Sequence, residues 1–531
     1  MTPIRTTVLL LAAGALLCTP LLSPRTARSS RDDHFTSSEQ CAVCHSVAPG
    51  ANAMRSPTGD DQSPYGLWQA TMMANSFRDP YFRAQLRKET TVAGEAVQEL
   101  CLRCHTPMVH HENVLAGKPA PRLADVDGDP FADDGVSCTV CHMMSAKGIG
   151  EATTFSGSLN FNDERRVFGP FADVATRPMQ NLVRYTPTQG MHIRHAGLCG
   201  GCHTLHTEEH GVTFPEQTPY LEWRNSEFSD EDGRTETSRT CQECHMPAIG
   251  ATRIARNPMG FDFNIPAREG YRAHAFVGGN AFMTEMIGAH REELDVLADR
   301  ESIERIVAAT RRQLGEATAK LAIEGVALEG GNVKFAVRIE NLTGHKFPSA
   351  YPSRRAWLHV AVQDGENTIF ECGDYDDGGR IVGVADEHSL PHVDVVRRAQ
   401  DVAVYELLAA DTEGKVTTFL TRMVQRKKDN RLLPRGFKAD GPHVGDTAPV
   451  GTTGDADFVG GGDTVHFEVP VPTELQGRLQ IVAHLYYQTI PPAWVEALRG
   501  IDAEECKRFV GWYDAADKSP ERIAEDIWRQ R

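Results

Sequence analysis

The pattern of apolar and polar residues divides the chain into segments of different type. Between residues 318 and 490 the two kinds alternate, as in Val333, Phe335, Val337 and Ile339 with polar or small residues between them. A period of two is that of a strand with one buried face. We expect strands near 333–339, 357–362, 402–409, 415–424, 465–469 and 478–488, and therefore an antiparallel β-sandwich over 318–490.

Helical spacing dominates the segments on either side of this region. Apolar residues recur at near-helical intervals from Glu285 to Ala317, which predicts a linking helix over 283–317. After Pro491 and Pro492, residues 491–531 are expected to form short helices. Residues 31–282 show no long periodic stretch and are expected to hold short helices and irregular chain. The fold class predicted is therefore multidomain α+β.

Residues 1–30 resemble an export signal. Arg5 precedes an apolar run from Val8 to Leu17 that is too short to span a bilayer. Lipidation at Cys18 is the alternative, although bulky Leu17 stands where lipidation signals have a small residue. Removal of the signal would place the mature protein in the bacterial periplasm or outside the cell. No later segment is long and apolar enough to span a membrane.

The net charge of -17 argues against a nucleic-acid partner, because phosphates require a basic face. The charge is compatible with a basic partner protein steered by electrostatics, and it equally suits plain solubility.

Ten of the 13 cysteines fall into five copies of C-x-x-C-H. The copies are Cys41/Cys44/His45, Cys101/Cys104/His105, Cys138/Cys141/His142, Cys199/Cys202/His203 and Cys241/Cys244/His245. This spacing is that of covalent c-type haem attachment. Two thiols bind the two vinyl groups of one haem, and the adjacent histidine becomes the proximal iron ligand.

Two other chemistries use paired cysteines. A zinc site needs two such pairs closing on one ion and would not require a histidine after each second cysteine. A redox dithiol would occur once, in a βαβ setting. Five repeats with histidine favour five haems, held within residues 31–282. So short a segment cannot bury five macrocycles separately, so the haems are expected to lie together and to form much of its core.

The sixth coordination position of each iron decides between carrier and enzyme, because an open position admits a substrate. His274, beside the flexible Gly278 and Gly279, is one candidate distal ligand. His345, in a turn between two predicted strands, could reach back from the sandwich and lock the two domains together. The other candidates are His195, or else its neighbour His192, and His34. A surface role remains the alternative for each of them.

Two further cysteines, Cys372 and Cys506, stand outside the motifs. In an oxidising compartment they could pair, and two free buried thiols are the alternative.

The motifs resemble those of the multihaem cytochrome c superfamily, which includes nitrifier tetrahaem cytochromes, pentahaem nitrite reductases and octahaem hydroxylamine oxidoreductases. The resemblance covers residues 34–290 and includes the segments Phe214–Gln217 and Tyr220–Trp223. The segments 341–348 and 428–437 resemble a β-rich C-terminal domain of a poorly characterised bacterial branch. The resemblance implies export, stacked haems and mostly bis-histidine ligation.

Two departures prevent transfer of an activity. No C-x-x-C-K occurs, although the nitrite reductases typically carry lysine at the catalytic haem, and only five motifs are present rather than eight. The favoured interpretation is a carrier that exchanges electrons with a redox partner protein. The alternative is an oxidoreductase that acts on a small nitrogen or sulfur species at one open haem.

Overall fold

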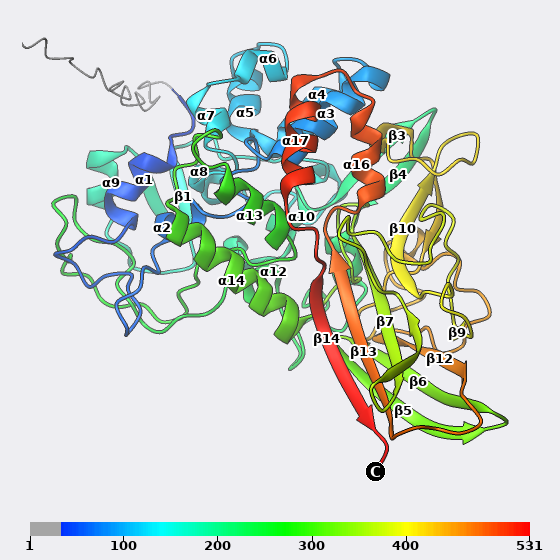
Figure 1. The fold of residues 1–531 in the computed structure, drawn as a ribbon. Helices are drawn as coiled ribbons and strands as arrows, with labels where there is room; N and C mark the ends of the chain where they lie inside the picture. Colours follow the sequence, from blue (N-terminus) through cyan, green and yellow to red (C-terminus); the bar gives the residue numbers. More distant parts are fainter. Residues whose placement is uncertain (1–32) are drawn as a thin grey trace, which may run out of the picture.

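The computed structural model describes residues 33–531, so the predicted signal segment and Cys18 lie outside the described residues. A helix-rich part formed by the N-terminal half lies beside a β-rich part formed by the C-terminal half (Figure 1). This arrangement confirms the multidomain α+β class.

The N-terminal part is built from short helices joined by irregular chain. Its helices are α1 (Ser38–His45), α2 (Pro64–Trp68), α3 (Pro80–Ala93), α4 (Val97–His105), α5 (Pro107–Leu115), α6 (Leu123–Val126), α7 (Pro130–Asp133), α8 (Cys138–Met143), α9 (Thr176–Leu182), α10 (Gly197–Gly200), α11 (Pro219–Arg224) and α12 (Cys241–His245). Two small sheets add to them, a parallel pair of β1 (Arg166–Gly169) with β2 (Thr186–Gln189) and an antiparallel pair of β3 (Leu205–Glu209) with β4 (Val212–Gln217).

The predicted linking helix is two helices, α13 (Ala281–Ala289) and α14 (Arg300–Ala317). The first ends at Ala289, and the ring of the cap residue His290 stacks on Trp512 at a centroid distance of 3.8 Å. The second begins where the side chain of Asp299 accepts a hydrogen bond from the backbone of Ser302. A cap of this kind satisfies a free N–H at the start of a helix and favours a new start there.

The β-rich part consists of two sheets that share one core. One sheet has the order β11-β10-β7-β13-β14 with β8 on β7, and the other has the order β5-β6-β12-β9. The strands are β5 (Ala319–Glu329), β6 (Asn332–Asn341), β7 (Arg355–Asp364), β8 (Asn367–Cys372), β9 (Val395–Val396), β10 (Val404–Ala410), β11 (Gln425–Asp429), β12 (Gly462–Pro470), β13 (Leu479–Gln488) and β14 (Glu521–Arg529).

The two inner faces supply the residues predicted from the alternation. Val337 and Phe335 of β6 lie in the same buried cluster as Val360 of β7 and Ile481 of β13. Among the named strands of the β-rich part, every pairing is antiparallel except that of β9 with β12. The strand predicted at 415–424 is wrong, because this stretch is irregular and β11 begins only at Gln425.

The C-terminal segment departs from the helices predicted for it. After α16 (Pro492–Arg499) and α17 (Glu504–Ala515), the chain forms β14, which pairs antiparallel with β13 along the edge of the sheet. Helix α17 packs on α3 of the N-terminal part, where the Cys506 thiol lies against the Ala84 carbonyl. Cys372 lies in the sandwich core instead, so both thiols are free and buried in different clusters.

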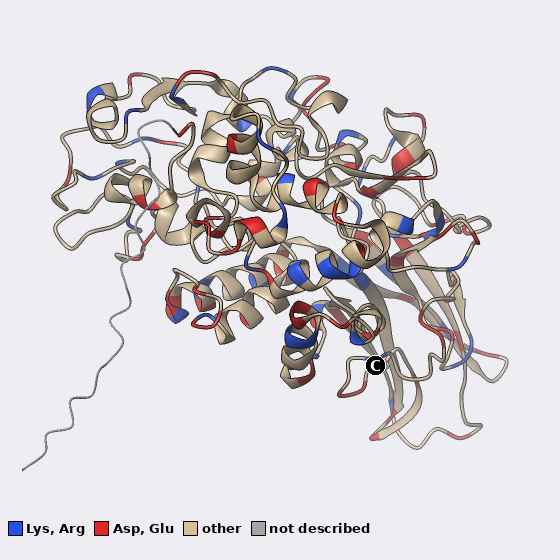
Figure 2. Ribbon diagram, turned by 90° about the horizontal axis from the view of Figure 1, so that it is seen from above, with Lys and Arg blue, Asp and Glu red and all other residues tan. Residues whose placement is uncertain are grey.

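Acidic and basic residues are interspersed along the chain in both parts of the molecule (Figure 2). Among residues 33–531, no helix combines the length and the apolar character needed to cross a lipid bilayer.

Candidate functional site

Each C-x-x-C-H motif lies on or beside a short helix: α1, α4, α8, α10 or α12. In a helix, residues i, i+3 and i+4 project from one face. The helix therefore presents two thiols and the following imidazole to the same side, as attachment to one flat macrocycle requires. All ten motif thiols are free, and none is fully buried.

Backbone carbonyl groups orient four of the five motif imidazoles. The Nδ1 atoms of His45, His105, His142 and His245 donate hydrogen bonds of 2.6–2.9 Å to the carbonyl oxygens of Ile254, Ser76, Phe168 and Val277, respectively. A carbonyl oxygen only accepts, so Nδ1 carries the proton and Nε2 keeps its lone pair. This is the tautomer that binds a metal through Nε2.

Burial keeps these imidazoles neutral. It lowers the pKa of His105 to about 4, and it also lowers the pKa values of His45, His142 and His245. A neutral imidazole is the ligating form, so these side chains are ready to bind a metal at physiological pH.

Two motif histidines face a second imidazole at a distance that fits one iron between them. The ring centroids of His142 and His274 are 6.3 Å apart, and those of His245 and His345 are 6.2 Å apart with ring planes within 6°. Two imidazoles that each bind one metal at about 2 Å would place their centroids roughly 6 Å apart. Nδ1 of His274 donates to the Arg272 carbonyl and that of His345 to the Lys346 carbonyl, which again leaves Nε2 for a metal.

The remaining candidate distal ligands are placed differently. His34 lies 5.5 Å from His111 between ring centroids, and its Nε2 atom is buried without a hydrogen-bond partner. Nδ1 of His195 accepts a hydrogen bond from Gly197, so its proton lies on Nε2. Nε2 of His192 donates to the Met144 carbonyl. Ligation by His34 or His195 therefore stays a prediction.

Thiols of different motifs lie next to one another. Side-chain contacts join Cys41 with Cys138, Cys104 with Cys202, and Cys199 with Cys241, while Cys141 and Cys199 interact electrostatically. The first motif thus adjoins the third, the third adjoins the fourth, and the fourth adjoins both the second and the fifth. All five attachment points form one connected group.

Several residues of this site escaped the sequence analysis. The Phe82 ring stacks on His105 at 3.6 Å with planes within 4°. Glu222 of α11 contacts the chain next to His345. Phe82 has no signal in the sequence, whereas Glu222 lies in the segment Tyr220–Trp223, one of the segments that carry the resemblance.

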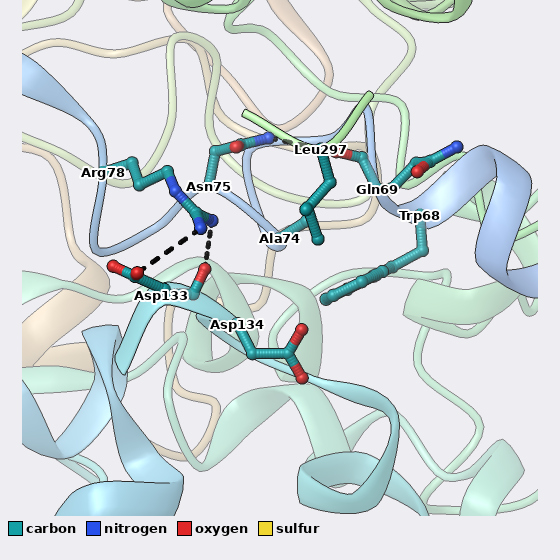
Figure 3. A pocket seen from close by; sticks show the side chains of 8 residues that line it. All are labelled: Trp68, Gln69, Ala74, Asn75, Arg78, Asp133, Asp134 and Leu297. Carbon is teal, nitrogen blue, oxygen red and sulfur yellow. Dashed lines mark hydrogen bonds and ion pairs between the residues drawn. The ribbon is translucent and has the colours of Figure 1, made fainter. Parts of the chain in front are cut away.

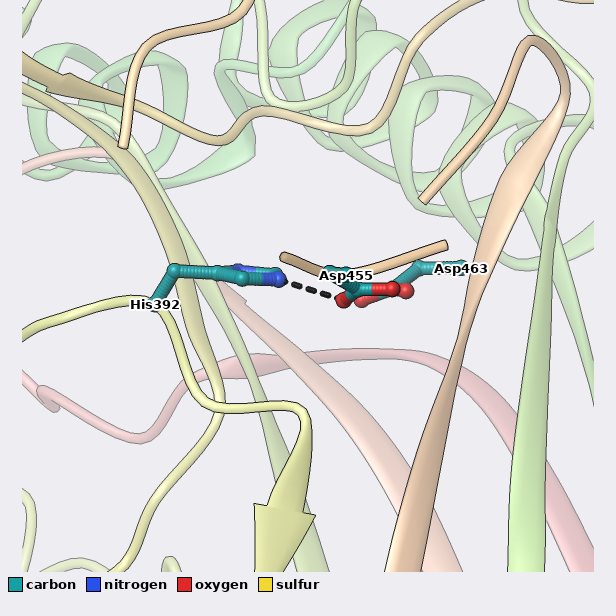
Figure 4. A group of neighbouring side chains, drawn as sticks. All are labelled: His392, Asp455 and Asp463. Carbon is teal, nitrogen blue, oxygen red and sulfur yellow. Dashed lines mark hydrogen bonds and ion pairs between the residues drawn. The ribbon is translucent and has the colours of Figure 1, made fainter. Parts of the chain in front are cut away.

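Two polar groups elsewhere are structural. The space between Arg78, Asp133 and their neighbours is too small to admit a water molecule (Figure 3). In the second group, His392 donates through Nε2 to Asp455, which lies beside Asp463 (Figure 4). The Asn430 amide donates to His392 Nδ1, so the proton of the neutral imidazole lies on Nε2 and that nitrogen has no lone pair for a cation.

Comparison with known proteins agrees with this geometry. Residues 40–143, which hold the first three motifs, match the family of cytochrome c554 and c-prime. The fold resembles the crystal structure of a penta-haem cytochrome c552 from Thermochromatium tepidum, with a TM-score of 0.54 and 18% identity over 94% of this chain and 99% of that chain. No curated protein matches the sequence.

The fold and the attachment motifs together resemble those of multihaem c-type cytochromes. Proteins of this class carry c-type haem and transfer electrons with it. Within the class, the more particular likeness is that of residues 40–143 to cytochrome c554 and c-prime.

Proposed function

We propose that this protein is an exported electron carrier that moves electrons through five covalently attached c-type haems in the periplasm or outside the cell. The observation that carries the proposal is the connected group of five attachment motifs, in which each motif adjoins at least one other. Cofactors attached at adjoining points can exchange electrons without a mobile carrier.

The residues have separate roles in this proposal. The bound haems supply one-electron chemistry at iron. The ten motif cysteines would tether them, and the five motif histidines would bind their irons. His274 and His345 complete the coordination at the third and fifth motifs, where the ring distances support it. Backbone carbonyls hold the imidazoles in the ligating tautomer.

A redox partner protein would donate or accept the electrons. The net charge of -17 supports a basic partner, whose approach would be accelerated at low salt. Because Figure 2 shows both signs of charge over both parts of the molecule, the net charge rather than a single acidic face supports this proposal.

The count of five haems has a direct test. Replacing Cys241 and Cys244 by serine should remove one haem. The denatured variant should therefore be lighter by one haem mass and have about four fifths of the haem absorbance of the wild type. Mass spectrometry and the haem absorbance of the unfolded chain measure this.

Cys372→Ala is the matched control, because Cys372 is a free buried thiol outside the motifs. It should retain all five haems. A wild-type chain with the bare polypeptide mass would contradict the proposed function.

One observation favours a second function, that of an oxidoreductase acting on a small nitrogen or sulfur species at one open haem iron. Tyr81, Tyr351 and Glu216 interact in the buried region where the β-rich part covers the second motif. The hydroxyl oxygens of both tyrosines and Oε2 of Glu216 are buried without a hydrogen bond of normal geometry, and so is Nε of nearby Arg354. Tyrosine, arginine and a protonated Glu216 could each hydrogen-bond a small anion or a haem propionate, so a ligand titration has to separate the two functions.

Titration of the oxidised protein with nitrite, hydroxylamine and sulfite separates the two functions. Under the second function, the wild type contains one high-spin haem whose absorption and EPR signals shift on addition, and Tyr351→Phe weakens that binding several-fold. Spectra that none of the three compounds changes would exclude the second function and leave the carrier.

A further inference from the structure

His345 belongs to the β-rich part but faces a histidine of the helix-rich part. It lies in the turn between β6 and β7, and its ring is 6.2 Å from that of His245. Nothing in the turn itself is regular secondary structure. Within the β-rich part the turn is tied down by the backbone pairing of Phe347 with Leu432, but this pairing does not fix its position relative to the helix-rich part.

Glu222 makes that contact from the helix-rich part. Its Oε2 atom accepts hydrogen bonds from the Lys346 backbone N–H at 3.0 Å and from the Ser349 hydroxyl at 3.3 Å. The carboxylate thus holds the turn at the residue directly after His345 and again three residues further on. Glu222 is 0% exposed, so water cannot substitute for it.

The other oxygen of Glu222 is bound by the β-rich part as well. Oε1 lies 3.2 Å from the Arg431 guanidinium, which also binds Asp429 through two bonds of 2.7 and 3.0 Å. The Lys346 ammonium lies 2.7 Å from Asp429. Two buried acids and two buried bases therefore form one network, which the partly exposed Arg426 joins 3.4 Å from Asp429 and which fixes the position of the Glu222 carboxylate.

Such a network is a costly way to join two domains. Desolvating four charges offsets most of their attraction, and well-packed apolar side chains would often stabilise equally well. What a charged network adds is a defined geometry, because each hydrogen bond has a preferred direction and length. Here the defined element is the turn that carries His345.

We propose that Glu222 is a positioning residue that holds His345 in place as the distal ligand at the fifth motif. This inference rests on the proposed function, because it requires haem at Cys241 and Cys244. It assigns the helix-rich part a role in orienting a ligand that the β-rich part supplies.

The test uses full-length, haem-loaded Glu222→Gln. Glutamine retains the shape of the side chain but offers one acceptor oxygen instead of two, so either the turn or Arg431 loses its partner. We expect about one fifth of the haem iron to become accessible to added imidazole or carbon monoxide, whereas that iron in the wild type should bind neither. Potentiometric titration should show a changed reduction potential for the same haem. The change is about 59 mV for each tenfold loss of ligand affinity that is specific to ferric iron.

Glu89→Gln is the matched control. Glu89 is also a buried carboxylate of the helix-rich part, and it accepts hydrogen bonds from the backbone of Leu420 and Thr421 in the β-rich part. That loop carries no histidine, so this variant should lose stability without exposing the iron at the fifth motif. If both variants bind added imidazole or carbon monoxide equally well, Glu222 contributes to the interface but does not position His345.

Thr343→Val provides a milder second variant. The Thr343 hydroxyl donates to the His345 carbonyl at 2.7 Å, and its removal loosens the same turn without removing a charge. It should expose the same iron to a smaller extent. If neither Glu222→Gln nor Thr343→Val alters ligand binding in a protein that carries five haems, the proposal is wrong, whereas absence of haem from the wild type would instead overturn the proposed function.

Discussion

Replacing Asp429 by asparagine is expected to lower the free energy of unfolding by about 3–5 kcal/mol. Asp429 is 0% exposed and binds Lys346 at 2.7 Å and Arg431 through two bonds. Burial alone would raise its pKa, but Arg431 and Lys346 hold the pKa of this carboxyl far below its ordinary value. Asparagine would leave buried Lys346 and Arg431, together with the partly exposed Arg426, facing the single remaining carboxylate of Glu222. Denaturant-induced unfolding of the haem-loaded protein measures the loss.

Asp514→Asn is a suitable control, because Asp514 also forms two bonds with an arginine, Arg499, at an exposed site. An exposed pair contributes little, so this variant should lose less than about 1 kcal/mol. Similar losses in the two variants would show that burial of the Asp429 network has no special importance for stability.

Replacing Glu216 by glutamine is expected to make the protein more stable at alkaline pH and to leave it unchanged near pH 4.5. Burial raises the pKa of Glu216 from 4.5 to about 8, and repulsion by Glu89 adds to this, against the opposing hydrogen bond from Gln217. Between these values the folded chain keeps a proton that the unfolded chain has released. Raising the pH through this window therefore favours unfolding of the wild type.

The size of this effect follows from the pKa difference. A pKa raised from 4.5 to about 8 lowers the free energy of unfolding of the wild type by roughly 5 kcal/mol at pH 8. Glutamine has no proton to lose, so the variant should not show this loss. Unfolding midpoints of both proteins between pH 4.5 and 8.5 should diverge as the pH rises. Parallel curves would show that the Glu216 side chain ionises as freely in the folded protein as in the unfolded chain.

The local pattern of apolar and polar residues predicted an element correctly where that element buries one face along its whole length. The alternation from Val333 to Ile339 and from Val465 to Val469 marks β6 and β12, which lie beside each other in the sheet. The pattern failed in 521–529, because the partner of β14 lies far away in the sequence and only tertiary pairing selects a strand there. It failed at 290–299 because the interruption of the predicted helix depends on the stacking of His290 on Trp512 and on the Asp299 cap.

The candidate site divides in the same way. Attachment of haem needs only residues three or four positions apart, so C-x-x-C-H is visible in the sequence. The distal positions need residues 132 and 100 places apart, as for His142 with His274 and His245 with His345, and the sequence could only nominate those histidines. The orienting carbonyls and Glu222 act across distances that only the folded chain brings together.

The position of β14 bears on how the end of the chain can be handled. Residues 521–529 cover the edge of β13, whose backbone groups would otherwise be open to pairing with a second molecule. Truncating the chain by about a dozen residues would therefore remove β14 and expose the long, apolar edge of β13, which favours self-association. A purification tag is therefore better placed away from residues 521–529.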